Sequence, residues 1–249
     1  MRTLLALVFV CPMLVVGSRS ADAQALSSTS DAPAAGIGVK VGTLGVGVQG
    51  AVRVAPRVAV RGGFNFFSYG HTFTQDGTNF DATLKLQSIE ASLDLGLGGG
   101  FRFSPGVLLR NNNHLDAVLS VPAGQQFSLG GSSYISQAGT PLGGTGLLDF
   151  KKFAPMLGIG FGSLVPRGNR HVTVAFDLGV VFQDSPNVAL TLSGNACLVA
   201  PNGTAVGCAP VNSLPGVAAN IASEQTKVSD SLKFFKYYPV TSVGVGWKF

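Results

Sequence analysis

The sequence Pro239-Val-Thr-Ser-Val-Gly-Val-Gly-Trp-Lys-Phe249 decides the fold. Read with a period of two, its larger side chains share one face, formed by Thr241, Val243, Val245, Trp247 and Phe249. The other face is small or polar and is formed by Ser242, Gly244, Gly246 and Lys248. This alternation predicts a β-strand with lipid on one side and a packed or wet interior on the other. Its length matches the roughly 9–11 residues that a tilted strand needs to cross a bilayer.

The composition of the whole chain favours the same architecture. Charged residues make up only 12% of the 249 residues, and the mean hydropathy is +0.37. No run approaches the roughly 20 apolar residues of a membrane-spanning helix. Glycine is abundant, with 34 residues. A hydrophobic protein without a hydrophobic helix is typical of a β-barrel, because the apolar residues stand at alternate positions.

The N-terminal residues have the pattern of a secretory signal peptide. Arg2 supplies a positive charge, residues 4–16 are apolar, and Ala21-Asp22-Ala23 forms a small-residue cleavage site. The apolar part is too short to anchor the chain in a membrane. We therefore expect residues 1–23 to be removed, residues 24–35 to form a flexible leader, and residues 36–249 to form the barrel.

Cysteine usage predicts one disulfide bond. Cys11 lies in the expected signal peptide, which leaves Cys197 and Cys208 in the mature chain. The Pro201-Asn-Gly203 turn between them would fold the segment back and bring the two sulfurs together. A secreted protein meets an oxidising compartment, where a disulfide is the expected state. We expect it to staple a loop, and two cysteines alone do not make a metal site.

Strand-like segments alternate with turn signals along the rest of the chain. The predicted strands cover residues 36–54, 58–73, 80–97, 101–110, 147–162, 172–182 and 239–249. The first region is either one long strand or two strands divided near residues 42–44. Division gives eight strands, the even number required if both termini lie on one side of the membrane.

The connections between these segments are unequal in length. Those at 55–57, 98–100 and 166–169 are short, whereas 111–145 and 184–238 read as long surface loops. Short turns on one side and long loops on the other are typical of outer-membrane barrels. Within the last loop, apolar residues at helical spacing predict an amphipathic helix over about 215–235. It could lie on the barrel mouth, pack against the outer rim, or cover its own hairpin.

On these features the chain resembles the small bacterial outer-membrane β-barrel proteins of the OmpA transmembrane-domain and OmpW kind. The resemblance implies an all-β, eight-stranded antiparallel transmembrane barrel in the cell outer membrane, in contact with lipid and lipopolysaccharide. It also implies insertion by the outer-membrane assembly machinery, which would read the aromatic finish at Trp247 and Phe249. The family implies no single activity, since its members include structural anchors, adhesins, narrow channels and lipid-modifying enzymes.

Charged residues at inward-facing positions are the main candidate site. They are Arg53, Arg61, Glu90, Asp94, Arg102, Arg110, Asp177 and Lys248. Eight strands leave an interior just wide enough for side chains to fill, and buried charges must pair. Because Glu90 and Asp94 share one strand and Arg61 lies on a neighbour, we expect ion pairs that plug the lumen. The alternative is a gate that opens to pass small solutes.

Other chemistries find little support in the sequence. Ser68 with His71, and His114 with Asp116, lie near predicted strand ends, but no catalytic motif joins them and we expect no enzymatic activity. The glycine-rich run at 42–47 lacks the lysine-serine pair of a nucleotide-binding loop. A net charge of +5 without a basic cluster gives no reason to expect nucleic acid.

The sequence therefore predicts a monomer without a cofactor, acting as an outer-membrane barrel with a structural or surface-interaction role. The alternative is a narrow passive channel for small or apolar solutes. A lipid-modifying enzyme is the third and least favoured reading.

Overall fold

The computed structural model describes residues 34–75 and 77–249. The expected signal peptide at 1–23 and nearly all of the expected leader lie outside these described residues. Within the described part of the chain, no helix is both long enough and apolar enough to cross a membrane.

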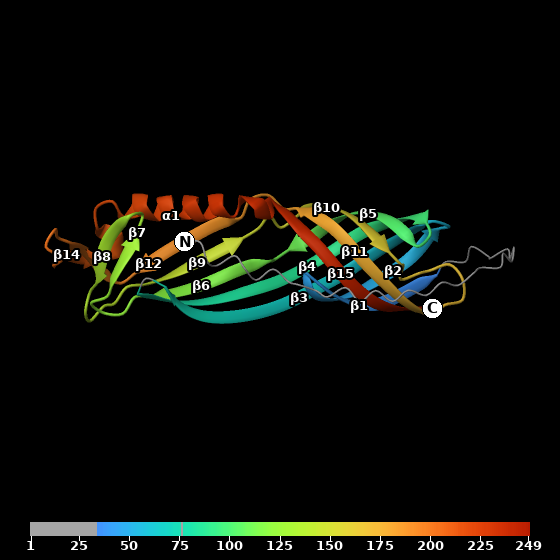
Figure 1. Cartoon of the computed structure of the whole chain (residues 1–249), viewed down its shortest axis with the longest axis horizontal. Coiled ribbons are helices and arrows are strands. Elements are labelled where there is room, and N and C mark those ends of the chain that lie inside the picture. The colour runs from blue at the N-terminus through green and yellow to red at the C-terminus, as the bar shows by residue number, and fades with distance from the viewer. Residues whose placement is uncertain (1–33, 76) are drawn as a thin grey trace. The chain divides into compact units, whose positions relative to one another are not determined.

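Fifteen strands form within the described residues, and eight of them close into a ring (Figure 1). These eight are β1 (Ala35–Gly42), β2 (Gly45–Ala55), β3 (Val58–Gln75), β4 (Thr78–Gly98), β5 (Phe101–Asn111), β10 (Ala154–Phe161), β11 (Val172–Phe182) and β15 (Tyr237–Lys248). Each pairs with its neighbours in antiparallel register, and the ring is closed by the pairing of β1 with β15. The predicted antiparallel β-barrel is confirmed, with the first region divided at residues 43–44.

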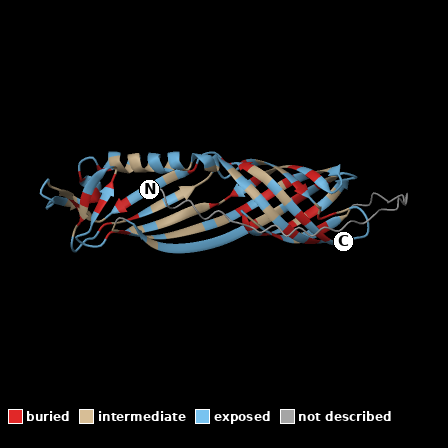
Figure 2. Cartoon of the chain, in the orientation of Figure 1, coloured by how far each residue is buried: buried red, intermediate tan, exposed pale blue. Residues whose placement is uncertain are grey.

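Alternating burial shows why these strands form a barrel (Figure 2). Along β11, Val172, Phe176 and Leu178 are between 53% and 59% exposed, whereas Thr173 and Ala175 are buried. The apolar side chains therefore lie on the outside of the ring. This is the reverse of a water-soluble sheet, whose exposed face is polar.

The region 111–145 is not a loop, as its polar and glycine-rich composition suggested. It contains β6 (His114–Ser120), β7 (Gln126–Leu129), β8 (Ser132–Ser136) and the start of β9 (Gly143–Asp149). The strands β3 and β4 run on past the ring, and the extended part of β4 supplies the hydrogen-bonding edge for β6. Pairing with a distant strand, and not local propensity, makes this segment extended.

The prediction of a single strand over residues 147–162 is also wrong. It is two strands, β9 and β10, interrupted at residues 150–153. β9 pairs with β6 and with β12 (Asn187–Ser193), whereas β10 pairs with β5 and β11 in the ring. The alternation read across residues 147–162 did not show the point at which the chain changes its pairing partners.

Outside the ring, β12, β9, β6, β4 and β3 form one sheet in that order, which we call the arm. The polarity of β3 reverses where it enters the arm, after Phe66, the last residue paired with β2. The outward side carries Phe64 and Phe66 within the ring and Ser68, Thr72 and Thr74 beyond it. The opposite side carries Arg61 and Asn65 inside the ring and Phe67, Tyr69, His71 and Phe73 beyond it, where Phe67 and Tyr69 are exposed. The outer surface thus changes from apolar to polar along a single strand.

The last excursion of the chain covers the far end of the arm. It contains β12, β13 (Asn195–Val199), β14 (Ala205–Pro210), the short helices η1 (Val211–Ser213) and η2 (Lys233–Lys236), and α1 (Val217–Ser231) between them. The predicted disulfide between Cys197 and Cys208 is present and joins β13 to β14. The predicted helix is real but shorter than 215–235: it begins after Gly216, which is left-handed at the N-cap, and it ends at Ser231, before η2.

A hydrophobic core outside the ring holds α1 in place. A second sheet, in the order β14-β13-β8-β7, and the helix bury a cluster that includes Phe127, Tyr134, Leu192 and Val217. The Asn220 side chain donates a hydrogen bond of 2.8 Å to the Tyr134 hydroxyl. The helix therefore packs on β12 of its own excursion and on β7 and β8 of the region before it, which none of the three placements expected from the sequence describes.

Candidate functional site in the barrel interior

The two-residue period of the ring strands places polar side chains inside the barrel. Arg61, Glu90, Asp94 and Arg102 are each 4–6% exposed although each can carry a full charge. Burying an isolated charge is costly, so the partners of these groups determine whether the interior is stable.

The first buried cluster joins four strands. Arg61 on β3 lies 3.2 Å from the Asp94 carboxylate on β4 and 3.1 Å from the Asp177 carboxylate on β11. Arg102 on β5 lies 2.6 Å from Asp177 and 3.6 Å from Asp94. The Ser104 hydroxyl donates a further hydrogen bond of 2.8 Å to Asp94. Two guanidinium groups and two carboxylates thus neutralise one another across the lumen.

A glycine makes the reach of Arg102 possible. Gly160 on β10 pairs with Arg102 on one side and with Asp177 on the other. A β-carbon added at Gly160 would lie 2.7 Å from the guanidinium carbon of Arg102, too close for two carbons in contact. The missing side chain on the intervening strand therefore lets the guanidinium cross to its carboxylate.

The second buried cluster lies around Glu90. The ammonium of Lys40 on β1 forms an ion pair and hydrogen bond with Glu90 on β4. The Asn65 amide donates 3.2 Å to Glu90 and 3.1 Å to the Ser88 hydroxyl. Gly63, opposite Glu90 on β3, leaves room for this crossing, since an added β-carbon would lie 3.1 Å from the carboxylate.

Together the two clusters are electrically neutral. Their cations are Lys40, Arg61 and Arg102, and their anions are Glu90, Asp94 and Asp177. Sequence reasoning placed five of these six in the lumen and missed Lys40. Residue alternation could have found it: Lys40 stands between Val39 and Val41, so if these two valines face outward, the lysine side chain faces the lumen.

Arg110, predicted to face the lumen, lies on the outside of the barrel. The register of β4 and β5 shifts, so that Glu90 pairs with Leu108 but Ile89 pairs with Arg110. Leu109 is the extra residue of this bulge, and a bulge reverses the alternation of every residue that follows it. Arg110 is therefore exposed beside the outward-facing Ile89.

Arg53 and Lys248 lie at the end of the barrel where β10 connects to β11, and neither joins the two clusters. The Arg53 guanidinium donates to the backbone carbonyls of Val165 and Pro166, at 2.5 Å and 2.6 Å. The Lys248 ammonium donates to the carbonyls of Pro166 and Gly168. Both side chains hold the connection at 162–171 against the barrel mouth.

The opposite end of the ring is closed by apolar side chains. Leu44, in the short turn between β1 and β2, packs in a buried cluster with Leu108, Ala154 and Val181. The Tyr238 hydroxyl donates a hydrogen bond of 2.6 Å to the carbonyl of Thr43, which ties this turn to β15.

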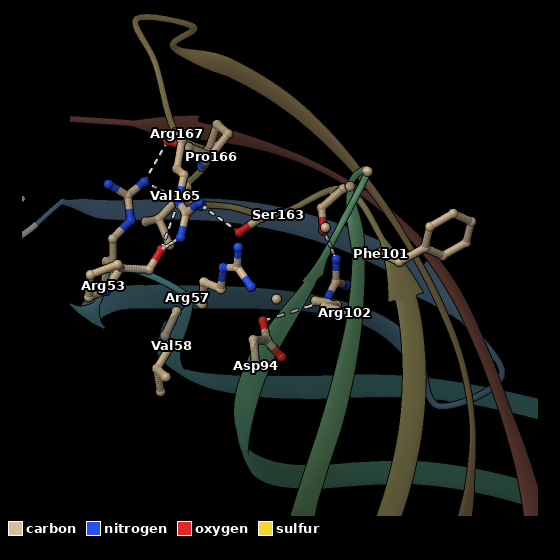
Figure 3. A pocket seen from close by; sticks show the side chains of 17 residues that line it. Arg53, Arg57, Val58, Asp94, Phe101, Arg102, Ser163, Val165, Pro166 and Arg167 are labelled. Atoms are coloured by element: carbon tan, nitrogen blue, oxygen red, sulfur yellow. Dashed lines mark hydrogen bonds and ion pairs between the residues drawn. The ribbon is translucent and has the colours of Figure 1, made fainter. Parts of the chain in front are cut away.

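Two cavities lie on either side of the first cluster. One, of about 320 Å³, opens at the end with the short turns, and Asp94 and Arg102 are among its lining residues (Figure 3). The other, of about 30 Å³, is lined by residues that include Arg61, Glu90 and Asp177. The second holds little more than one water molecule.

The residues considered for catalysis are not brought into one site. Ser68 and His71 are three positions apart on a regularly paired stretch of β3, so their side chains leave opposite faces of the arm. The His114 ring lies 3.4 Å from the Asp116 carboxylate, which also accepts an ion pair of 3.0 Å from Lys85.

These features define a class: an eight-stranded antiparallel β-barrel with an apolar exterior and an interior occupied by a neutral network of ion pairs. No protein-family model matches the sequence, and no curated protein matches it either. Two solved structures from Acinetobacter baumannii share the fold. CarO is 21% identical, with 86% of this chain and 97% of that chain covered and a TM-score of 0.52. CarO2 is 19% identical, with 87% and 98% covered and a TM-score of 0.54. At these identities the likeness shows the shared fold, and the narrower resemblance to OmpA and OmpW stays a prediction.

Proposed function

We propose that this chain is an outer-membrane β-barrel whose interior is closed by paired charges and whose role is structural or in surface interactions. The observation that carries the proposal is the combination of an apolar exterior with a neutral, buried ion network. Exposed Val, Leu and Phe side chains on the outside of a closed ring are stable in contact with lipid and not in contact with water. Three cations paired with three anions give the interior no net charge to attract permeating ions.

The arm supports the surface-interaction part of the proposal. Beyond Phe66 the outward side chains of β3 are Ser and Thr, which suit water and not hydrocarbon. The disulfide of β13 and β14 reinforces the same region against unfolding. Lipopolysaccharide surrounding the barrel and the assembly machinery, through the exposed Trp247 and Phe249, are the partners we propose, with the protein acting as a monomer.

A narrow passive channel is the second candidate. The two cavities favour it, since they leave the two charge clusters and the apolar layer at Leu44 as the barriers along the described interior. Rearrangement of those side chains would be the gating step.

Single-channel recording separates the two functions. Refolded protein in a planar bilayer should show no steady conductance, and steady openings of the unmodified protein would favour the channel. Arg61→Ala and Glu90→Ala each remove one member of the network, and we expect them to produce a leak. Lys151→Ala, at an exposed ion pair outside the ring, is the matched control and should remain silent.

Two further measurements test the membrane assignment and the absence of catalysis. Folded barrels migrate differently in gels before and after boiling. A single band position under both conditions would contradict the proposal that this chain is a membrane β-barrel. Cells carrying His71→Ala should have unaltered lipid A, and altered lipid A would revive the enzyme hypothesis.

A further inference from the structure

The larger cavity is unusually rich in arginine. Four arginines line it, from the end of β2, the turn that follows, the start of β5 and the connection between β10 and β11: Arg53, Arg57, Arg102 and Arg167 (Figure 3). Asp94 is the one acidic residue among the described residues that line it. Lys248 adds a fifth cation close by, because its ammonium shares the Pro166 carbonyl with Arg53.

The charges of these cations are not compensated by the protein. Asp94 is already shared between Arg61 and Arg102 within the neutral network. Within residues 34–75 and 77–249, no carboxylate forms an ion pair with Arg53, Arg57 or Arg167. The hydrogen bonds of Arg53 and Arg167 go to backbone carbonyls, which are neutral. The four arginines and one aspartate that line the cavity therefore leave a net positive charge of about three, to which Lys248 adds another beside it.

The cavity also presents hydrogen-bond donors that have no protein acceptor among the described residues. The Arg102 guanidinium is only 4% exposed and is already directed at Asp94, Asp177 and the Gly162 carbonyl, so it contributes charge to the cavity and no free donor. The Arg57 guanidinium, in the exposed turn between β2 and β3, has no protein partner among the same residues. A guanidinium carries five N–H donors, so those of Arg57 are open to an anion bound in the cavity.

We propose that this cavity binds a small anion carrying a phosphoryl or carboxylate group. Guanidinium groups recognise these two groups through paired, charge-assisted hydrogen bonds. The volume of about 320 Å³ is at the lower end of the range for small-molecule sites. Arg57 and Arg167 hold the anion from the open side, and Arg102 adds its charge at the lining while it stays bound to Asp94 and Asp177. The site does not depend on whether the barrel conducts.

Chemical protection provides the first test, on the full mature chain refolded in detergent. Phenylglyoxal modifies accessible arginines, and mass spectrometry reports the rate at each position. Inorganic phosphate, added in a chloride buffer, should slow the modification of Arg57 severalfold. Arg110, also exposed but on the outside of the ring, is the internal control and should be modified at an unchanged rate. Equal slowing at both positions, or none at Arg57, would overturn the proposal.

Calorimetric titration provides the second test and distinguishes the two ligand chemistries. Inorganic phosphate and citrate are titrated separately, and saturable binding of either one supports the site and names its group. Arg57→Gln should weaken that binding about tenfold, the usual effect of losing one charge-assisted hydrogen bond. Arg110→Gln should leave it unchanged. Failure of both anions to bind, or equal affinity in Arg57→Gln, would refute the assignment.

Discussion

Removing Arg61 is the most direct perturbation of the barrel interior. Its guanidinium donates to both oxygens of Asp177, each at 3.1 Å, and to Asp94 at 3.2 Å, and it lies 3.4 Å from the Gln49 side-chain oxygen. Arg61→Met keeps much of the side-chain volume but removes the charge. Two buried carboxylates would then share the single guanidinium of Arg102.

Breaking a buried ion pair by removing one partner costs about 3–5 kcal/mol, because the other charge stays buried without compensation. We therefore expect Arg61→Met to lower the free energy of unfolding by an amount in this range. Adding Asp177→Asn restores equal numbers of cations and anions. The double variant should be more stable than Arg61→Met alone, although a second side chain has been changed.

Urea unfolding in phospholipid vesicles, followed by tryptophan fluorescence or by the gel shift of the folded barrel, measures these differences. Arg110→Met is the matched control, since this arginine is exposed outside the ring, and it should change stability by less than about 0.5 kcal/mol. If Arg61→Met and Arg110→Met proved equally mild, or if Asp177→Asn gave no rescue, the interior would not be held by these pairs.

Three further predictions concern the wall, the arm and the membrane boundary. Gly160→Ala should destabilise the barrel by about 1–3 kcal/mol in the same assay, because its methyl group would meet a guanidinium carbon, whereas Gly62→Ala, with 3.7 Å of clearance, should be nearly neutral. Cys197→Ser should expose the hairpin of β13 and β14 to limited proteolysis while the gel shift of the ring is kept; an uncleaved hairpin would show that the disulfide is dispensable. In EPR power saturation, a nitroxide label at position 176 should be relaxed mainly by lipid-soluble oxygen, and one at position 72 mainly by a water-soluble nickel reagent. Similar accessibility of both labels to the two reagents would disprove the polarity reversal.

Local alternation was sufficient to predict most of the ring. A residue's side in a strand depends only on its parity, so Arg61, Glu90, Asp94, Arg102 and Asp177 could be assigned to the interior without knowing their partners. The spacing of Cys197 and Cys208 around a turn likewise predicted their disulfide. These features are encoded within a few neighbouring residues.

Long-range pairing decided what the sequence could not. The bulge at Leu109 is invisible in β5 alone and becomes defined only when β5 is matched against β4, so the prediction for Arg110 failed. β6 exists because β4 runs past the ring and offers it an edge, whereas β7 and β8 pair with each other and β8 with the distant β13. The cavity arginines come from three separate segments, at 53–57, 102 and 167, that only barrel closure gathers.

The sequence by itself therefore determined the period, the apolar exterior, the disulfide and the class of barrel, since each follows from the side chains of one short segment. The tertiary structure alone decided which charges pair, where the register shifts and which cations remain unpaired around the cavity. Those properties depend on distances between strands that are far apart in the chain, and no local pattern encodes such distances.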